Sequence, residues 1–183
     1  MNDPLQAWRV DIGAGDEVSA ALGPATSAPC GALFICAHGA GGDMNDKGVV
    51  AVSDQLRSRG IDVVRFNFPY REKKSGRPDP MPRLKQCYAA VAQHARAAVK
   101  AGLLILGGRS LGGRVASMLA AESHPCDGLL LLAYPLHPAG QPHKLRDAHL
   151  QRIAVPVLCF SGTRDALCRR DLMEAAIGSL SGR

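Results

Sequence analysis

The sequence has few aromatic residues and no apolar run long enough to cross a membrane. Phe, Trp and Tyr make up 4% of its 183 residues, which leaves no evident platform for stacking nucleic-acid bases. The longest apolar stretches, such as residues 128–134, fall well short of the ~20 residues that a membrane-spanning helix needs. Asp3, Arg9 and Asp11 interrupt the N-terminal segment, where a secretory signal would be continuously apolar. We therefore expect a cytoplasmic protein that binds neither nucleic acid nor a membrane.

The six cysteines lack the spacing of metal-binding or redox motifs. There is no C-x-x-C pair, and the gap between Cys30 and Cys36 is longer than the usual zinc-ligand spacing. The glycine-rich residues 39–44 do not satisfy G-x-G-x-x-G, and G-x-x-x-x-G-K-[ST] is not found. We expect reduced thiols and no metal, nucleotide or other cofactor.

The formal net charge of +6 raises the question of an anionic partner. The only dense basic cluster, residues 71–77, is interrupted by Glu72 and belongs to a segment rich in proline and glycine. We interpret this cluster as a solvated loop, and an anionic substrate is the alternative.

The pattern of apolar segments predicts a single α/β domain over residues 1–183. Buried strands and helices alternate, which is typical of a mostly parallel sheet with helices on both faces and with ligands at the carboxyl ends of the strands. A proline-rich segment, residues 67–82, is expected to be a long loop. The predicted strands are residues 8–12, 17–22, 32–37, 61–66, 103–106, 128–133 and 155–160, and the predicted helices are residues 45–59, 83–101 and 110–123, with another beginning near residue 169.

A G-x-S-x-G motif lies between a predicted strand and a predicted helix. It reads Gly108-Arg109-Ser110-Leu111-Gly112 and follows the strand at residues 103–106 directly. A nucleophilic serine needs a tight, strained turn of this kind, and the two glycines allow close backbone approach. The motif therefore favours Ser110 as a nucleophile, and a structural glycine turn is the alternative.

Two further requirements of acyl transfer have candidates elsewhere in the chain. The amides of Leu111 and Ala40 are the expected oxyanion donors, because Ala40 lies in the small-residue segment 38–44 after an earlier strand. The alternative interpretation of that segment is a plain glycine-rich turn with no part in catalysis. Asp165, just beyond the strand at residues 155–160, is the expected acid, or alternatively the cap of the following helix.

Several segments together resemble a small α/β-hydrolase family. These are residues 37–44 (AHGAGGDM), 65–70 (RFNFPY), 107–114 (GGRSLGGR), 134–138 (YPLHP) and 162–165 (GTRD). The family is similar to the hydrolase-like domain of subunit three of the NSL histone-acetyltransferase complex and to the testis-expressed thirty protein.

The resemblance implies an α/β-hydrolase fold, with Ser110 as nucleophile and Asp165 as the acid of a triad. It places residues 68–70 and 134–138 beside the site. The candidate substrate contacts are His38, Gly39, Tyr70, Arg109 and His137. His38 is alternatively a residue that shapes the oxyanion loop, and Arg109 is alternatively an ion-pair partner of a neighbouring helix.

The sequence departs from this family at its C-terminal end. Such hydrolases continue with one more strand and a loop that carries the catalytic histidine, whereas no histidine follows His149 here. We expect a chain that lacks its last ~25 to 35 residues, or a member without the base, and slow turnover in either case. His137 or His143, in the loop after residues 128–133, is the alternative base, although we favour surface or loop-structuring roles for both. Residues 155–160 would form an exposed sheet edge, which predicts self-association.

Two functions remain open at this point. The first is a serine hydrolase that acts on a small ester, thioester or amide through an acyl-enzyme on Ser110. The second is a non-catalytic protein-interaction module with a hydrolase fold, since one fold hosts many functions.

Overall fold

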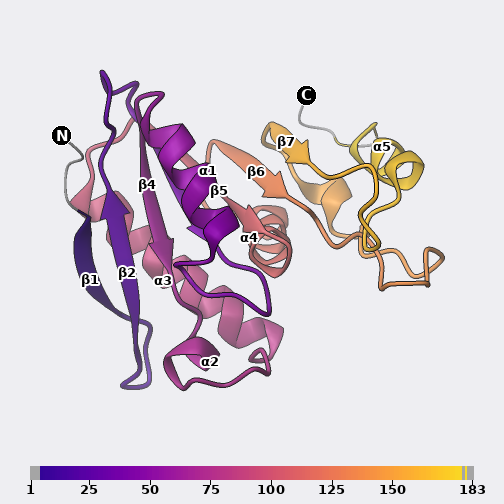
Figure 1. The fold of residues 1–183 in the computed structure, drawn as a ribbon, viewed down its shortest axis with the longest axis horizontal. Coiled ribbons are helices and arrows are strands. Elements are labelled where there is room, and N and C mark those ends of the chain that lie inside the picture. The colour runs from indigo at the N-terminus through magenta and orange to yellow at the C-terminus, as the bar shows by residue number, and fades with distance from the viewer. Residues whose placement is uncertain (1–4, 179, 181–183) are drawn as a thin grey trace.

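The computed structural model describes residues 5–178 and 180, and its centre is a seven-stranded sheet (Figure 1). The strand order is β1-β2-β4-β3-β5-β6-β7. The pairs β1/β2 and β2/β4 are antiparallel, and the other neighbours are parallel. The mostly parallel α/β architecture predicted from the alternation of apolar segments is confirmed. The strands are β1 Gln6–Asp11, β2 Glu17–Gly23, β3 Ala32–Ala37, β4 Ile61–Phe66, β5 Leu103–Arg109, β6 Gly128–Leu132 and β7 Val157–Phe160.

The helices agree with the apolar periodicity except in the segment predicted to be a loop. Residues 67–82 contain a short helix, α2, because Pro69 occupies its first turn, where no amide donor is needed. Helix α3 likewise begins at Met81, with Pro82 in its first turn. The helical segments are α1 Lys47–Arg57, α2 Pro69–Glu72, α3 Met81–Ala98, α4 Leu111–Ala121, η1 Leu150–Arg152 and α5 Arg170–Gly178. Of the helices in the described part of the chain, none combines the length and apolar character that a membrane crossing needs.

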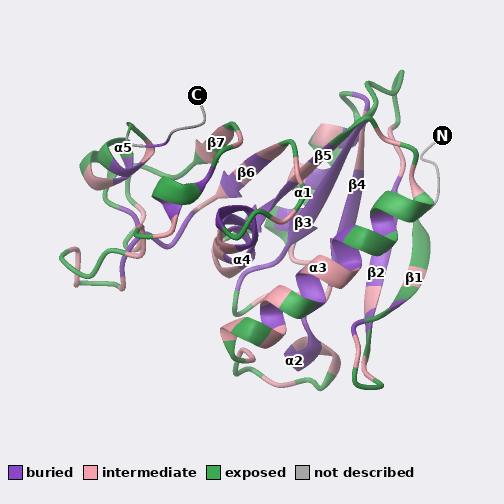
Figure 2. Ribbon diagram, turned by 180° about the vertical axis from the view of Figure 1, so that it is seen from behind, coloured by how far each residue is buried: buried purple, intermediate pink, exposed green. Residues whose placement is uncertain are grey.

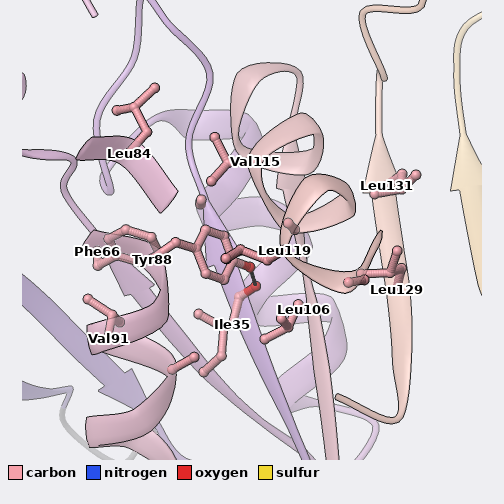
Figure 3. Close-up of a cluster of buried hydrophobic side chains, with 14 of the residues drawn as sticks. Ile35, Phe66, Leu84, Tyr88, Val91, Leu106, Val115, Leu119, Leu129 and Leu131 are labelled. Atoms are coloured by element: carbon pink, nitrogen blue, oxygen red, sulfur yellow. Dashed lines mark hydrogen bonds between the residues drawn. The ribbon is translucent and has the colours of Figure 1, made fainter. Parts of the chain in front are cut away.

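The main core lies between the sheet and helices α3 and α4, which cover one of its faces (Figure 2). Figure 3 shows Tyr88 of α3 reaching toward Ile35, with Val115 and Leu119 of α4 beside it. The Tyr88 hydroxyl lies 2.7 and 2.8 Å from the carbonyl oxygens of Ile35 and Gly107, which share its one proton, and it accepts from the Gly107 amide at 2.7 Å. This hydroxyl joins β3 to β5 just before the Ser110 turn.

The carboxyl ends of the last three strands are held together by backbone hydrogen bonds. The Ser110 amide donates to the Leu132 carbonyl at 2.8 Å, and the Ala133 amide donates to the Phe160 carbonyl at 2.7 Å. The segments that follow β5, β6 and β7 therefore start side by side, at the edge where parallel sheets bind ligands.

The opposite face of the sheet is covered only in part. Helix α1 packs over β3 and β4, where Phe34, Val49 and Val63 form a second small core (Figure 1). Over β5 to β7, an apolar groove of about 390 Å³ lies open, with Ile105, Leu130 and Leu158 among its lining residues. β7 ends the sheet, as expected for residues 155–160, and its side chains Leu158 and Phe160 are 56% and 58% exposed.

We expect this edge to cause self-association, because β7 offers unpaired backbone groups beside exposed apolar side chains. Sedimentation velocity at increasing protein concentration should show dimers or larger species, and Phe160→Lys should shift the protein toward the monomer. Leu145→Lys changes another exposed leucine, outside the sheet, and serves as the matched control. A monomer at all concentrations, or an equal effect of both substitutions, would contradict the expectation.

Candidate active site

Ser110 occupies a strained turn between β5 and α4. Its φ and ψ are 49° and −110°, a conformation that residues with a Cβ rarely adopt, and α4 begins at the next residue. The side chain is half-buried, and a Cβ built on Gly39 would lie 3.6 Å from the Ser110 Cβ. The segment after β3 thus faces the serine, as the sequence predicts for an oxyanion loop.

The two glycines of the G-x-S-x-G motif are required by close contact with the end of β3. A Cβ at Gly108, whose φ is 139°, would lie 2.2 Å from the Ala37 carbonyl oxygen. A Cβ at Gly112 would lie 2.4 Å from the same oxygen. Because these contacts are with backbone, they cannot be relieved by a change of rotamer, and together they hold Ser110 at this edge of the sheet.

The two expected oxyanion donors lie on either side of this turn. Leu111 is the first residue of α4, so its amide has no carbonyl partner within the helix. Ala40 is exposed in the facing loop, and no acceptor for its amide is found among residues 5–178 and 180. The positive end of the α4 dipole adds to the stabilisation of negative charge at this position.

His38 and Tyr70 lie beneath the oxyanion loop. The His38 side chain is fully buried, and its Nε2 accepts from the Phe68 amide at 3.2 Å, so Nδ1 carries the proton and donates to the Gly39 carbonyl at 2.7 Å. Burial lowers the pKa of His38. The Tyr70 hydroxyl donates to the Ala40 carbonyl at 2.8 Å. Both ring nitrogens of His38 are engaged and the Tyr70 hydroxyl gives its proton to the loop, so both rings help to shape the loop that faces Ser110. A substrate contact by either residue stays a prediction.

Arg109 is exposed next to the serine and pairs with a neighbouring helix. Its Nη1 lies 3.6 Å from Asp46 Oδ2, and Asp46 caps α1 by accepting from the Gly48 amide at 3.0 Å. Of the two roles considered from the sequence, the structure contains the ion pair. Because both side chains remain partly exposed, the pair contributes little to stability.

Asp165 lies in the loop between β7 and α5, half-buried. Its Oδ1 accepts from the Leu167 amide at 2.9 Å, ahead of the first residue of α5, so its carboxylate does not cap that helix. This places a carboxylate in the loop after β7, two strands from Ser110.

His137 ties this loop to the loop after β6. The Arg169 amide donates to His137 Nε2 at 3.0 Å, and His137 Nδ1 donates to the Pro138 carbonyl at 3.0 Å. The His137 amide also donates to the Leu167 carbonyl, at 3.0 Å. With both ring nitrogens engaged and the residue buried, His137 is a loop anchor, and its predicted substrate contact has no free ring atom.

A model of a family described as "Alpha/beta hydrolase domain" matches residues 31–181 of this chain. The chain belongs to this alpha/beta hydrolase family. Known structures agree with the fold of the hydrolase domain. An alpha-beta serine hydrolase homologue from Coxiella burnetii is 21% identical with a TM-score of 0.79, and the match covers 97% of this chain and 83% of that chain.

Two further structures have the same architecture as the hydrolase domain. XC6422 from Xanthomonas campestris, described as an a/b serine hydrolase without a lid, is 25% identical with a TM-score of 0.72, over 93% of this chain and 77% of that chain. Est1E from Butyrivibrio proteoclasticus is 17% identical with a TM-score of 0.77, and the match covers 96% of this chain and 85% of that chain.

The hydrolase domain brings no imidazole to Ser110. All six histidines fall within the described residues, and no hydrogen bond joins any of them to the Ser110 hydroxyl there. His137 is engaged as above, and no polar contact of His143 is found in that part of the chain, so neither meets the serine as a replacement base. No group of three or more His, Cys, Asp or Glu side chains gathers as metal ligands within residues 5–178 and 180.

A serine and a histidine do meet elsewhere in the hydrolase domain, but in the wrong arrangement for catalysis. Ser117 Oγ lies 2.8 Å from His149 Nε2 and donates its only proton to the Arg114 carbonyl at 2.8 Å. His149 must therefore donate to Ser117, the reverse of a base that activates a nucleophile. Ser117 is also fully buried inside α4. The pair joins α4 to the η1 segment, and sequence reasoning missed it because Ser117 has no surrounding motif.

His149 should make the folded hydrolase domain sensitive to acid. Burial lowers its pKa to about 4, with Arg114 and Arg152 adding to the effect. The unfolded chain binds a proton near the ordinary histidine pKa of ~6.5, so stability falls as pH drops from ~6.5 toward ~4. Allowing for partial solvent screening, we expect a loss of about 2 kcal/mol in the free energy of unfolding.

Urea unfolding at intervals between pH 7.5 and 4 measures this loss. His149→Gln keeps a donor for Ser117 and should reduce the pH dependence. The remainder comes from other groups whose pKa values are lowered, among them His38 and His124 and the carboxylates of Asp16, Glu72 and Asp171. His143→Gln changes an exposed histidine and should keep the wild-type profile. An unchanged profile in His149→Gln would show that His149 is not the source.

Proposed function

We propose that this chain is a serine hydrolase that acts on a small ester, thioester or amide through an acyl-enzyme on Ser110. The observation that carries the proposal is the strained Ser110 backbone at the start of α4, with the Ala40 loop opposite. Strain of this kind persists only where the surrounding structure enforces it, and it is characteristic of functional sites.

The proposed reaction proceeds in two steps. Ser110 Oγ attacks the substrate carbonyl carbon, its proton passes to solvent, and the resulting oxyanion accepts hydrogen bonds from the Leu111 and Ala40 amides. The tetrahedral intermediate collapses, the leaving group departs with a proton, and water later releases the acid. Because no described histidine takes the serine proton, the first step is slow.

A fluorophosphonate probe tests this proposal. We expect slow modification at Ser110, detected by intact mass and peptide mapping, and Ser110→Ala should remove it. Ser117→Ala is the matched control, because it removes the serine that contacts a histidine without changing the turn. Labelling that survives Ser110→Ala, or that is lost in Ser117→Ala alone, would overturn the assignment.

A second candidate function is a non-catalytic protein-interaction module, and the observation that favours it is the lack of an imidazole at Ser110. Within the alpha/beta hydrolases we propose the closer kinship with the NSL subunit three domain and the testis-expressed thirty protein, on the motifs at residues 37–44 and 162–165. We also propose a cytosolic location, since all six cysteines are free thiols. A folded protein that captures no probe at Ser110 under any condition would favour the interaction module.

A further inference from the structure

Two peptide groups meet at Ala40, and each has its carbonyl held from beneath. The Gly39 carbonyl accepts from His38 Nδ1 at 2.7 Å and from the Gly42 amide at 3.1 Å. The Ala40 carbonyl accepts from the Tyr70 hydroxyl at 2.8 Å. Because each peptide group is planar, fixing both carbonyls also fixes the two backbone rotations at Ala40.

The direction of the Ala40 amide follows from this arrangement. In a trans peptide the N–H and C=O bonds point to opposite sides, and the Gly39 carbonyl faces the buried His38 ring. The Ala40 N–H belongs to the same peptide, so it points away from the buried ring, toward the open side of the loop. The neighbouring Gly39 lies against Ser110. An amide on the open side of a loop that lies against Ser110 is consistent with an oxyanion donor.

Tyr70 is itself held firmly in place. Its amide donates to Asp79 Oδ2 at 2.8 Å, and its ring stacks on Phe68 with centroids 6.4 Å apart and meets the His38 ring edge-on at 5.9 Å. The residue is 2% exposed, and burial raises the pKa of its hydroxyl to about 12, so the hydroxyl stays protonated and able to donate.

We propose that Tyr70 is a positioning residue, whose hydroxyl holds the peptide after Ala40 so that the Ala40 amide stays aimed at the oxyanion. This inference rests on the proposed function, because it assigns Tyr70 a part in that same reaction without contact with substrate. Losing one oxyanion donor typically costs about 10²- to 10³-fold in rate. The Tyr70 hydroxyl is one of two side-chain contacts that hold the Ala40 amide, and the His38 contact remains without it. Loss of the hydroxyl should therefore lower the rate by about tenfold.

Tyr70→Phe tests the proposal, since it removes only the hydroxyl and keeps the packed ring. The rate constant for fluorophosphonate modification of Ser110 should fall about tenfold while the reversible affinity for the probe stays unchanged. The ¹⁵N order parameter of the Ala40 amide should fall from the ~0.85 of a rigid backbone toward ~0.6. Ser117→Ala is the matched control, because it also removes a buried hydroxyl that donates to a backbone carbonyl, that of Arg114 at 2.8 Å.

A general loss of stability is separated from positioning by comparing the two variants. Ser117→Ala should also lower the free energy of unfolding, and it should leave both the Ala40 order parameter and the labelling rate within about twofold of wild type. If Tyr70→Phe leaves the Ala40 order parameter unchanged, the positioning role is wrong, whatever happens to stability. If wild type is never labelled at Ser110, the proposed hydrolase function fails, and the Ala40 order parameter still decides whether Tyr70 fixes the loop.

Discussion

Replacing Gly112 by alanine is expected to destabilise the fold by about 3 kcal/mol and to remove Ser110 reactivity. The added Cβ would lie 2.4 Å from the Ala37 carbonyl oxygen and 2.6 Å from its carbonyl carbon. Neither atom belongs to a flexible side chain, so the start of α4 must move away from β3 and carry Ser110 with it. A loss of this size is a large share of the ~5–15 kcal/mol that stabilises a typical domain. Urea unfolding and fluorophosphonate labelling measure the two effects.

Gly48→Ala is the matched control for this substitution. Gly48 is the second residue of α1, as Gly112 is of α4, so both changes have the same effect on intrinsic helix propensity. A Cβ at Gly48 would meet only side chains, the nearest atom being Asp46 Oδ1 at 3.3 Å. We expect Gly48→Ala to leave the free energy of unfolding nearly unchanged. Similar losses in both variants would mean that the contact with Ala37 is not what excludes alanine.

The turn at Ser110 could be predicted from the sequence because its causes are local. A buried strand, a pair of glycines two residues from the serine and a following helix are all adjacent in the chain. Asp165 could be placed for the same reason, since it directly follows a recognisable strand. The alternation of apolar runs likewise predicted the parallel sheet, and the edge at β7 was expected from the family resemblance, whose members continue with one more strand.

A loop-shaping role for His38 and His137 was within reach of the sequence, whereas the role of Tyr70 and the distant backbone partners of all three rings were not. Tyr70 contacts a carbonyl 30 positions earlier, and His137 accepts from an amide 32 positions later. Backbone groups carry no residue-type signal, so a polar ring near a predicted site is naturally taken as a substrate contact. The folded chain instead uses these rings to fix the loops around the site.

Helix α2 also escaped prediction, for a physical reason that recurs at α3. The prolines of residues 67–82 favour a loop when read from the sequence, although proline is acceptable in the first turn of a helix. Both Pro69 and Pro82 lie in first turns. The consequence is functional, because α2 carries Tyr70 to the underside of the Ala40 loop.

Free imidazole at ~0.1 M is expected to accelerate the reaction of Ser110 with the fluorophosphonate probe by about tenfold or more. A positioned general base contributes ~10²- to 10⁴-fold, and a diffusing one recovers only part of this because it lacks fixed orientation. No histidine among residues 5–178 and 180 hydrogen-bonds to the Ser110 hydroxyl, and three of them are engaged elsewhere: His38 and His137 by backbone groups, and His149 by Ser117. The effect is measured as the rate of fluorophosphonate modification of Ser110, followed by intact mass at constant ionic strength.

The acceleration should follow the concentration of neutral imidazole and disappear at a pH where imidazole is protonated, because only the neutral ring accepts a proton. Ser110→Ala gives the background rate of modification at other sites, and sodium chloride in place of imidazole controls for salt. A rate that rises equally in Ser110→Ala would show that imidazole acts elsewhere. No rise at any concentration would mean that the strained serine has no open side from which a base can reach it, and the hydroxyl would then serve the fold rather than a reaction.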